Sequence, residues 1–96
     1  MAGYQNNFKC VIISPKRLVF EKEIQSLFVT SNTGEFEILA YHYPLLGVLT
    51  KSNIVIDWKE FVPISSGVIR FYANECTIMI EEEGQTSLKK IDKKEK

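Results

Sequence analysis

The sequence has few of the residues that build metal or catalytic sites. Its 96 residues contain one histidine and two cysteines, too few ligands for a structural zinc site. No GxSxG or cysteine-centred catalytic signature occurs, and the five glycines are scattered singly rather than gathered in a phosphate-binding loop. The sequence therefore predicts a protein that is not an enzyme, with no catalytic residue, cofactor or metal ligand.

The sequence also lacks a long apolar run and any net charge. No stretch approaches the roughly 18 apolar residues of a membrane span, and the first residues carry no signal core, so we expect other proteins to hold the chain at any membrane. The last eight residues hold five lysines against two acids, a net of +3, and the other 88 residues carry −3. Because this body has no basic stripe, nucleic-acid binding is not expected.

The two cysteines, Cys10 and Cys76, lie inside apolar runs rather than in a CxxC pair. Buried free thiols are the interpretation that this pattern favours, because small apolar cysteines are common in protein cores. A disulfide between them stays open on two conditions: the two strands must be adjacent and the compartment oxidising.

Short apolar or alternating runs recur every 8–12 positions between turn residues, which is typical of β-strands. No amphipathic helix is expected before residue 83. The runs predict an all-β fold, a two-sheet β-sandwich or flattened barrel of nine or ten short, mainly antiparallel strands. Residues 1–82 form this domain, and residues 83–96 form a polar, Lys-rich tail that we expect to be disordered. The predicted strands cover residues 8–13, 17–21, 23–31, 35–39, 45–49, 53–58, 60–65, 68–72 and 76–82.

The large apolar residues divide into a predicted core and a predicted surface patch. In the last strand, Cys76, Ile78 and Ile80 share one face. The predicted core further includes Met79 and the aromatic residues Phe20, Phe28, Phe61 and Phe71. A partner-facing patch is predicted for Tyr41, Tyr43, Trp58 and Tyr72, because ten thin strands offer more apolar positions than one small interior can hold.

His42 is the one obvious acid–base group, and Glu35 and Glu37 lie at i, i+2 just upstream, a spacing that also suits a general acid–base pair. No nucleophile signature accompanies them. A loop histidine between Tyr41 and Tyr43 is better interpreted as a docking element, since tyrosine gives large contact area at low entropic cost.

Four segments, in order and over residues 8–82, resemble the epsilon subunit of F-type ATP synthases. The segment from Gly34 to Leu46, GEFEILAYHYPLL, is similar to the family's GEFGILPGHAPLLT. The segments SPKRLVF from Ser14, ISSGVI from Ile64 and NECTIMI from Asn74 resemble the first hairpin, the SGGFLEV stretch and the NxVTVLAD stretch.

The sequence also departs from the family pattern. Glu37 replaces a glycine, Ala40 and Tyr41 replace a Pro-Gly pair, and Ser66 stands for the first of two glycines. The C-terminal helical hairpin of many members is missing here. The ATP binding and inhibition of hydrolysis associated with that hairpin are therefore not carried over.

The resemblance implies a non-catalytic rotor-stalk subunit of a proton-translocating F-type ATP synthase. Such a subunit links the gamma subunit to the membrane c-ring, and indirectly to the alpha/beta hexamer, on the cytoplasmic side of a bacterial membrane. By matching position, the residues implied to face the c-ring are Thr33, Gly34 and Glu35. Those implied on the gamma side are Ser14 and His42, together with Tyr41 and Tyr43.

Two alternatives stay open at this point. The first is a paralogue in a divergent rotary motor. In this alternative, Glu37 and Tyr41 indicate that the domain stands on a different base within the motor. The second is a free-standing β-sandwich that binds a protein, small ligand or carbohydrate, which predicts a concave, aromatic-lined pocket around Trp58.

Overall fold

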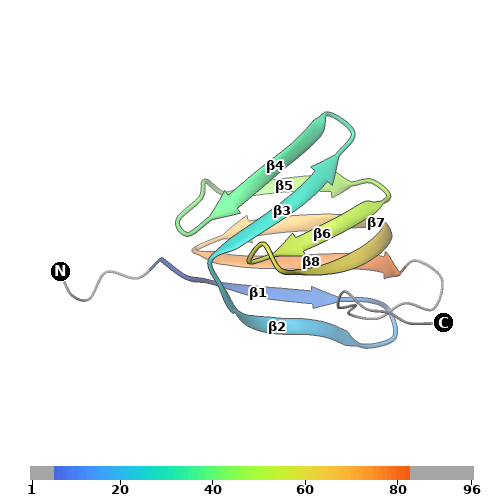
Figure 1. Cartoon of the computed structure of the whole chain (residues 1–96), viewed down its shortest axis with the longest axis horizontal. Helices are drawn as coiled ribbons and strands as arrows, with labels where there is room; N and C mark the ends of the chain where they lie inside the picture. Colours follow the sequence, from blue (N-terminus) through green and yellow to red (C-terminus); the bar gives the residue numbers. More distant parts are fainter. Residues whose placement is uncertain (1–5, 83–96) are drawn as a thin grey trace.

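The computed structural model describes residues 6–82 as eight strands (Figure 1). The predicted Lys-rich tail lies outside the described residues. The strands are β1 (Phe8–Ile13), β2 (Leu18–Ile24), β3 (Ser26–Ser31), β4 (Gly34–Leu39), β5 (Leu45–Leu49), β6 (Ser52–Ile56), β7 (Glu60–Tyr72) and β8 (Glu75–Glu82). The all-β prediction is confirmed. Among the described residues, no helix is long and apolar enough to cross a membrane.

The strands form one hydrogen-bonded sheet that folds over on itself. Its order is β2-β1-β8-β7-β5-β3-β4, and β6 pairs with both β3 and β7. β5 and β6 pair with consecutive parts of β7, with Leu49 opposite Gly67 and Ser52 opposite Ile64. A register shift between Ile64 and Ser66 bends β7 at the same level. Strands that bend at such a bulge can pass from one layer of a sandwich to the other.

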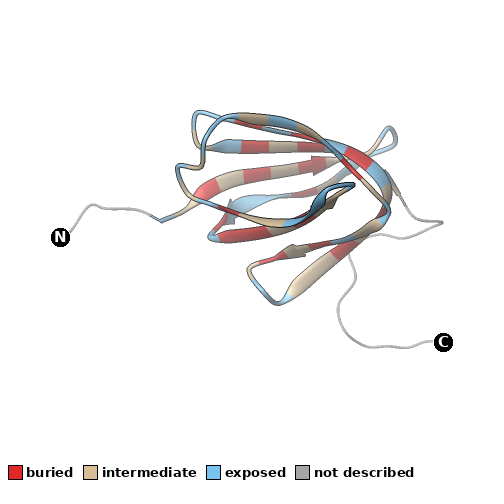
Figure 2. Ribbon diagram, turned by 90° about the horizontal axis from the view of Figure 1, so that it is seen from above, coloured by how far each residue is buried: buried red, intermediate tan, exposed pale blue. Residues whose placement is uncertain are grey.

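The bend creates two layers around one core. The first layer holds β2, β1, β8, the end of β7 and β5. The second layer holds the start of β7 with β6, β3 and β4 (Figures 1 and 2). Seven of the eight strand pairings are antiparallel, and β1 with β8 is parallel. The buried apolar residues of these strands form a single cluster. This agrees with the predicted two-sheet, mainly antiparallel sandwich.

Two predicted strand boundaries were wrong. Residues 23–31 were predicted as one strand, but the chain leaves β2 at Ile24 and starts β3 at Ser26. The Oδ1 atom of Asp57 accepts hydrogen bonds from the backbone N–H groups of Gln25 (2.7 Å) and Ser26 (3.0 Å), which fixes this crossing between layers. Residues 60–72 were predicted as two strands, yet they form the single bent β7, so residues 6–82 hold eight strands rather than nine or ten.

The core is confirmed in part. Cys76, Ile78 and Ile80 are buried, as the alternation in β8 predicted, and so are Phe20 and Phe71. The ring of Phe71 meets that of Phe8 edge-on at 5.5 Å. Met79 was predicted in the core and is 55% exposed, because its neighbours Ile78 and Ile80 occupy the inward face.

Phe28 and Phe61 are only half-buried, so their assignment to the core was also wrong. Each lies opposite Val55 of β6 in the register, and neither belongs to the buried cluster. Residues directly opposite in a ladder share one face of the sheet. These two rings therefore lie on the outer face of the second layer.

Gly67, at the bend, is tightly packed. A Cβ atom there would lie 3.1 Å from the carbonyl oxygen of Met79 and 3.4 Å from Cγ2 of Ile80, whereas at Gly47 the nearest atom, in Ile69, would be 3.6 Å away. The carbonyl oxygen of Met79 belongs to the backbone of the β7–β8 ladder, so it yields less readily than a side chain would. The bend therefore favours glycine at position 67, whereas position 47 has room for a side chain.

We predict that Gly67→Ala lowers the free energy of unfolding by about 1–2 kcal/mol, because the added methyl group overpacks the bend. Gly47→Ala, the matched control, is expected to leave stability unchanged or to raise it by up to about 1 kcal/mol, since glycine weakens a strand interior. Urea unfolding followed by circular dichroism measures both. Equal losses for the two variants would contradict this account of the bend.

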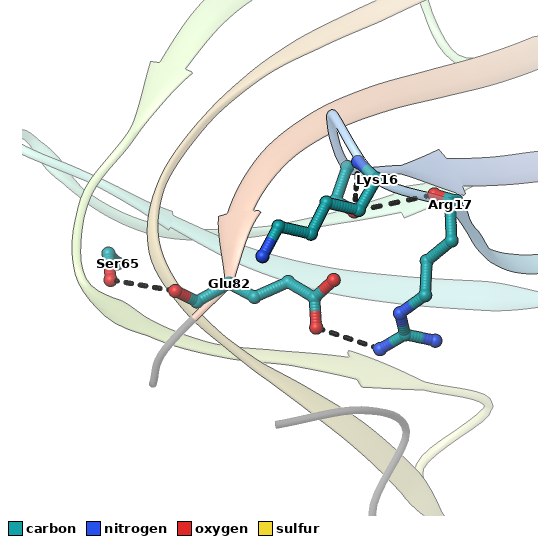
Figure 3. Close-up of polar contacts among 5 residues, drawn as sticks. Lys16, Arg17, Ser65 and Glu82 are labelled. Carbon is teal, nitrogen blue, oxygen red and sulfur yellow. Dashed lines mark hydrogen bonds and ion pairs between the residues drawn. The ribbon is translucent and has the colours of Figure 1, made fainter. Parts of the chain in front are cut away.

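The end of β8 is fixed to the turn that follows β1 (Figure 3). The guanidinium group of Arg17 donates to Glu82 at 2.7 Å, and the hydroxyl of Ser65 donates to the Glu82 carbonyl at 3.3 Å. The hydrogen bond from Arg17, helped by Ser14, holds the pKa of the Glu82 carboxyl below its ordinary value of 4.5. The paired, charged carboxylate therefore stabilises the folded chain.

The depressed pKa predicts a pH dependence. Because the folded pKa of Glu82 lies below the unfolded one, its contribution to stability is complete above pH values near 4.5 and is lost as pH falls through the folded pKa. Glu82→Gln should be less stable than the parent chain at neutral pH, and the difference should vanish in acid. Thermal midpoints measured from neutral to acid pH test this. A difference that persists at the acid end would point to packing rather than charge.

Candidate protein-docking surface

The outward face of the first layer carries a row of apolar side chains. In the register, Ile13 of β1 lies opposite Met79 of β8, Met79 opposite Val68 of β7, and Val68 opposite Val48 of β5. Val48 is 66% exposed, Met79 55% and Val68 41%, and Ile13 is half-buried. We call Ile13, Met79, Val68 and Val48 the outer row.

A hollow of about 520 Å³ lies over the outer row. Its lining is mostly apolar and includes Pro15 and the backbone at Gly67. Contiguous exposed apolar surface on a small domain typically marks a protein interaction site. The outer row therefore has the character of a docking surface rather than of a site that performs chemistry.

The apolar face continues to the other end of the sheet. Two residues further along the β5–β7 register, Leu46 lies opposite Arg70 and is 75% exposed, and Tyr72 is 62% exposed. A second hollow of about 420 Å³ is lined by Pro44, Leu45, Leu46, Arg70, Phe71 and Tyr72. The face thus runs from the turn after β1 to the loop before β5.

Sequence reasoning missed most of this face. Met79 was assigned to the core, and Leu46, Val48 and Val68 were not selected as exposed. In LLGVL and SSGVI, apolar residues stand at successive positions, so alternation does not tell which face is inward. The number of apolar residues could have indicated this face. A solvent-facing side of an antiparallel sheet is mostly polar, whereas two adjacent strands here each carry two outward apolar residues.

The residues predicted on the gamma side do not all lie together. Ser14 lines the hollow over the outer row, next to the end of β1. The ring of His42 packs against that of Phe71 at 5.8 Å, near the start of β8, and its Nδ1 atom is 2.8 Å from the carbonyl oxygen of Tyr43. Ser14 therefore lies at one end of the first layer and His42 at the other, where its ring contacts the inward-facing Phe71. Tyr43, which is 83% exposed, lies beside His42.

Tyr41 belongs to a different hollow. With Trp58, Leu39, Ala40, Gln25 and Asn6 it lines a cavity of about 340 Å³. This is the aromatic hollow around Trp58 that the ligand-binding alternative predicted. Tyr41 and Trp58 are exposed, as predicted, and both have left-handed backbone conformations, with φ of 66° and 61°.

Asn74 fixes the position of the Tyr41 loop. Its Oδ1 atom accepts from the backbone N–H of Tyr41 at 2.6 Å, and its Nδ2 atom donates to the carbonyl of Asn7 at 3.0 Å. Ala40 and Tyr41 stand where the resemblance has Pro-Gly, so Tyr41 occupies a conformation that usually favours glycine. The hydrogen bond to Asn74 helps to hold that conformation.

The residues predicted on the c-ring side lie together at the β3–β4 hairpin. The hydroxyl of Ser31 is 2.9 Å from that of Thr33, accepts from the Thr33 N–H at 3.2 Å and donates to the Gly34 carbonyl at 3.2 Å. Thr33, Gly34 and Glu35 are exposed, whereas Glu37 accepts a hydrogen bond of 2.6 Å from the buried Ser26. The hairpin presents one exposed carboxylate on a short, internally bonded turn.

Relatives with similar sequences are ATP synthase epsilon chains. The family model described as ATP synthase, Delta/Epsilon chain, beta-sandwich domain matches residues 7–83. The epsilon chain of Wolbachia pipientis subsp. Culex pipiens is 34% identical over 82 residues, which is 80% of this chain and 72% of the relative. The chloroplast epsilon chain of Pyropia yezoensis is 35% identical over 89 residues, 85% of this chain and 66% of the relative. An epsilon chain of Clostridium perfringens is 29% identical, and this chain spans 59% of its length.

Two solved structures with the same fold are of mitochondrial ATP synthases. One chain of the Euglena gracilis OSCP/F1/c-ring structure matches with a TM-score of 0.75 over 85% of this chain and 56% of that one. One chain of the Tetrahymena thermophila central stalk/c-ring structure matches with a TM-score of 0.68 over 77% and 63%. Both are 15% identical and show the fold alone. The match over residues 7–83 and the Wolbachia relative show more: the chain belongs to the β-sandwich domain family of ATP synthase delta/epsilon chains.

Proposed function

We propose that this protein is a non-catalytic subunit of the rotor stalk of an F-type ATP synthase, which joins the gamma subunit to the membrane c-ring and couples ATP synthesis to proton transport. The family membership supports this role, and the two structural neighbours come from structures that include the c-ring. The alpha/beta hexamer is an indirect partner. Relatives include bacterial and chloroplast proteins, so the cytoplasmic side of a bacterial membrane stays a prediction.

The observation that carries the proposal is the outer row. A subunit that transmits torque must bind its neighbour through rigid elements, because a loop would absorb the motion. The outer row lies on four adjacent strands of one hydrogen-bonded layer, backed by a single buried cluster. Its exposed apolar side chains supply the kind of surface that forms the centre of a protein interface.

We assign the outer row, with Leu46, to the contact with gamma. Ser14 lies at one end of this face. At the other end the exposed Tyr43 precedes Pro44, which lines the second hollow, and His42 lies beside Tyr43 against the inward-facing Phe71. These polar groups at both ends fit the polar rim that surrounds an apolar interface centre. Tyr41 lines the separate hollow with Trp58, so its place on the gamma side stays a prediction from the resemblance alone.

The β3–β4 hairpin is the proposed contact with the c-ring. Its hydroxyl bonds hold the turn in one geometry, and Glu35 offers an exposed charge to basic or polar loop residues. Exposed charges at the edge of an interface contribute more to association rate and register than to affinity.

Met79→Glu should prevent assembly. A carboxylate at the centre of the outer row would lose its hydrating water on binding and would be surrounded by apolar side chains. We therefore expect the affinity for gamma to fall by about 30-fold or more. The measurement is recovery of gamma, alpha and beta subunits by tagged protein from native membranes. Tagged parent chain should recover all three.

Leu39→Glu is the matched control for this experiment. Leu39 is 49% exposed, close to the 55% of Met79, but it lies on β4 in the other layer. It should bind normally, and circular dichroism should show both variants folded. Failure of the parent chain to recover gamma would refute the proposed function. Loss of binding only in Leu39→Glu would move the gamma contact to the other layer.

Glu35→Lys tests the c-ring contact. The reversed charge should weaken binding to detergent-solubilised c-ring several-fold at low ionic strength, and the difference should shrink as salt screens it. Glu23→Lys, an exposed charge reversal on β2, is the control and should bind as the parent chain does. Binding to gamma should be unaffected by either change. Equal binding of Glu35→Lys and the parent chain to the c-ring at low salt would contradict the assignment of the β3–β4 hairpin to the c-ring contact.

A further inference from the structure

Two thiols lie opposite each other inside the sandwich. Cys10 of β1 and Cys76 of β8 are direct partners in the parallel register, and both are free and completely buried. Their neighbours on the same inward face are Phe8 and Phe71, whose rings pack together. The sequence left a disulfide open on condition that the two strands are adjacent, and the structure meets that condition.

We propose that Cys10 and Cys76 form a site of oxidative modification, at which a disulfide oxidant such as glutathione disulfide converts the two thiols to a single intrachain disulfide joining β1 to β8. This property is separate from the docking role, because it involves only the inward face.

The backbone spacing permits this bond. Neighbouring strands lie about 4.7–4.9 Å apart, and disulfides join residues whose Cα atoms are about 4.4–6.8 Å apart. The Cβ atoms of a disulfide need to approach to about 3.8 Å, closer than an in-register pair holds them, so forming the bond draws the two strands together. A bond formed under such strain is reduced more readily than an ordinary structural disulfide, which makes this modification reversible.

The reaction proceeds by two exchanges. One thiolate attacks glutathione disulfide, forms a mixed disulfide and releases one glutathione thiolate; the second thiolate then attacks the mixed disulfide and releases the other. The two protein protons end on the two glutathione molecules, and the two electrons lost by the cysteines reduce the glutathione disulfide.

Burial makes this site slow in the folded protein. Hydrogen bonding to the thiol of Cys76 and burial raise the pKa of the Cys10 thiol well above its ordinary range, so very little thiolate is present. Glutathione disulfide reaches neither sulfur until the sheet opens locally. Within residues 6–82, β1 pairs on its other side with β2, which is the edge strand of the sheet, so separation of these two strands from the rest of the sandwich would expose Cys10.

The bond should also stabilise the chain. Cys10 and Cys76 are 66 positions apart in the sequence, so linking them restricts the unfolded chain strongly. Oxidised protein should therefore have a higher thermal midpoint than reduced protein, and dithiothreitol should reverse the difference.

The experiment equilibrates the reduced full chain with glutathione buffers of increasing oxidised fraction, both without urea and at the urea midpoint of unfolding. Remaining thiols are alkylated with iodoacetamide, and the products are mapped by mass spectrometry. We expect an intrachain Cys10–Cys76 disulfide that forms slowly without urea, rapidly at the midpoint, and disappears on reduction. The thermal midpoint should rise with the disulfide fraction.

Cys10→Ser and Cys76→Ser are the controls, and neither should show an oxidation-dependent thermal midpoint. The measurement on the parent chain stands even if a variant folds poorly. Three results would overturn the proposal: both thiols free at every buffer composition at the urea midpoint, mixed disulfides with glutathione as the end product, or disulfide-linked dimers in place of the intrachain bond.

Discussion

The structure depends on the bend that carries β7 from one layer to the other. At that level β5 gives way to β6, the register shifts between Ile64 and Ser66, and Gly67 lies against the backbone of β8. Without the bend, the same eight strands would form one open sheet with two wet faces. With it, Val62 and Ile64 before the bend and Ile69 and Phe71 after it point into the same core.

The bend also decides what stays outside. In each layer the residues that alternate with the core face solvent, and in the first layer they include the outer row, one apolar residue on each of four adjacent strands. A domain of this size buries only about 60–65% of its unfolded surface, so some apolar side chains stay on its outer faces. An interface that covers the outer row would remove this surface from water. Binding would then raise the apparent stability of the domain by mass action.

Sequence patterns predicted the parts of the fold in which one face is buried and the other wet. In β8 the inward residues Cys76, Ile78 and Ile80 alternate with Thr77 and Glu81, and the prediction was right except for Met79. Alternation failed where both faces of a strand carry apolar residues. A two-residue period divides the side chains between the two faces, but it does not tell which face points into the core. That choice is made by the register with neighbouring strands, as it is for Phe28 and Phe61, and a single sequence does not contain it.

Turn geometry explains which connections between strands were predicted from the sequence and which were missed. Ala73 and Asn74 fall in the gap between the predicted strands 68–72 and 76–82, and both residues have positive φ, as short hairpins require. The crossing at Gln25 was missed because its cause is the side chain of Asp57, which is distant in the sequence. Tyr41 and Trp58 hold left-handed conformations that cost a bulky residue free energy, and Asn74 contributes to holding Tyr41. Long-range hydrogen bonds of this kind therefore position both the crossing at Gln25 and the loop at Tyr41.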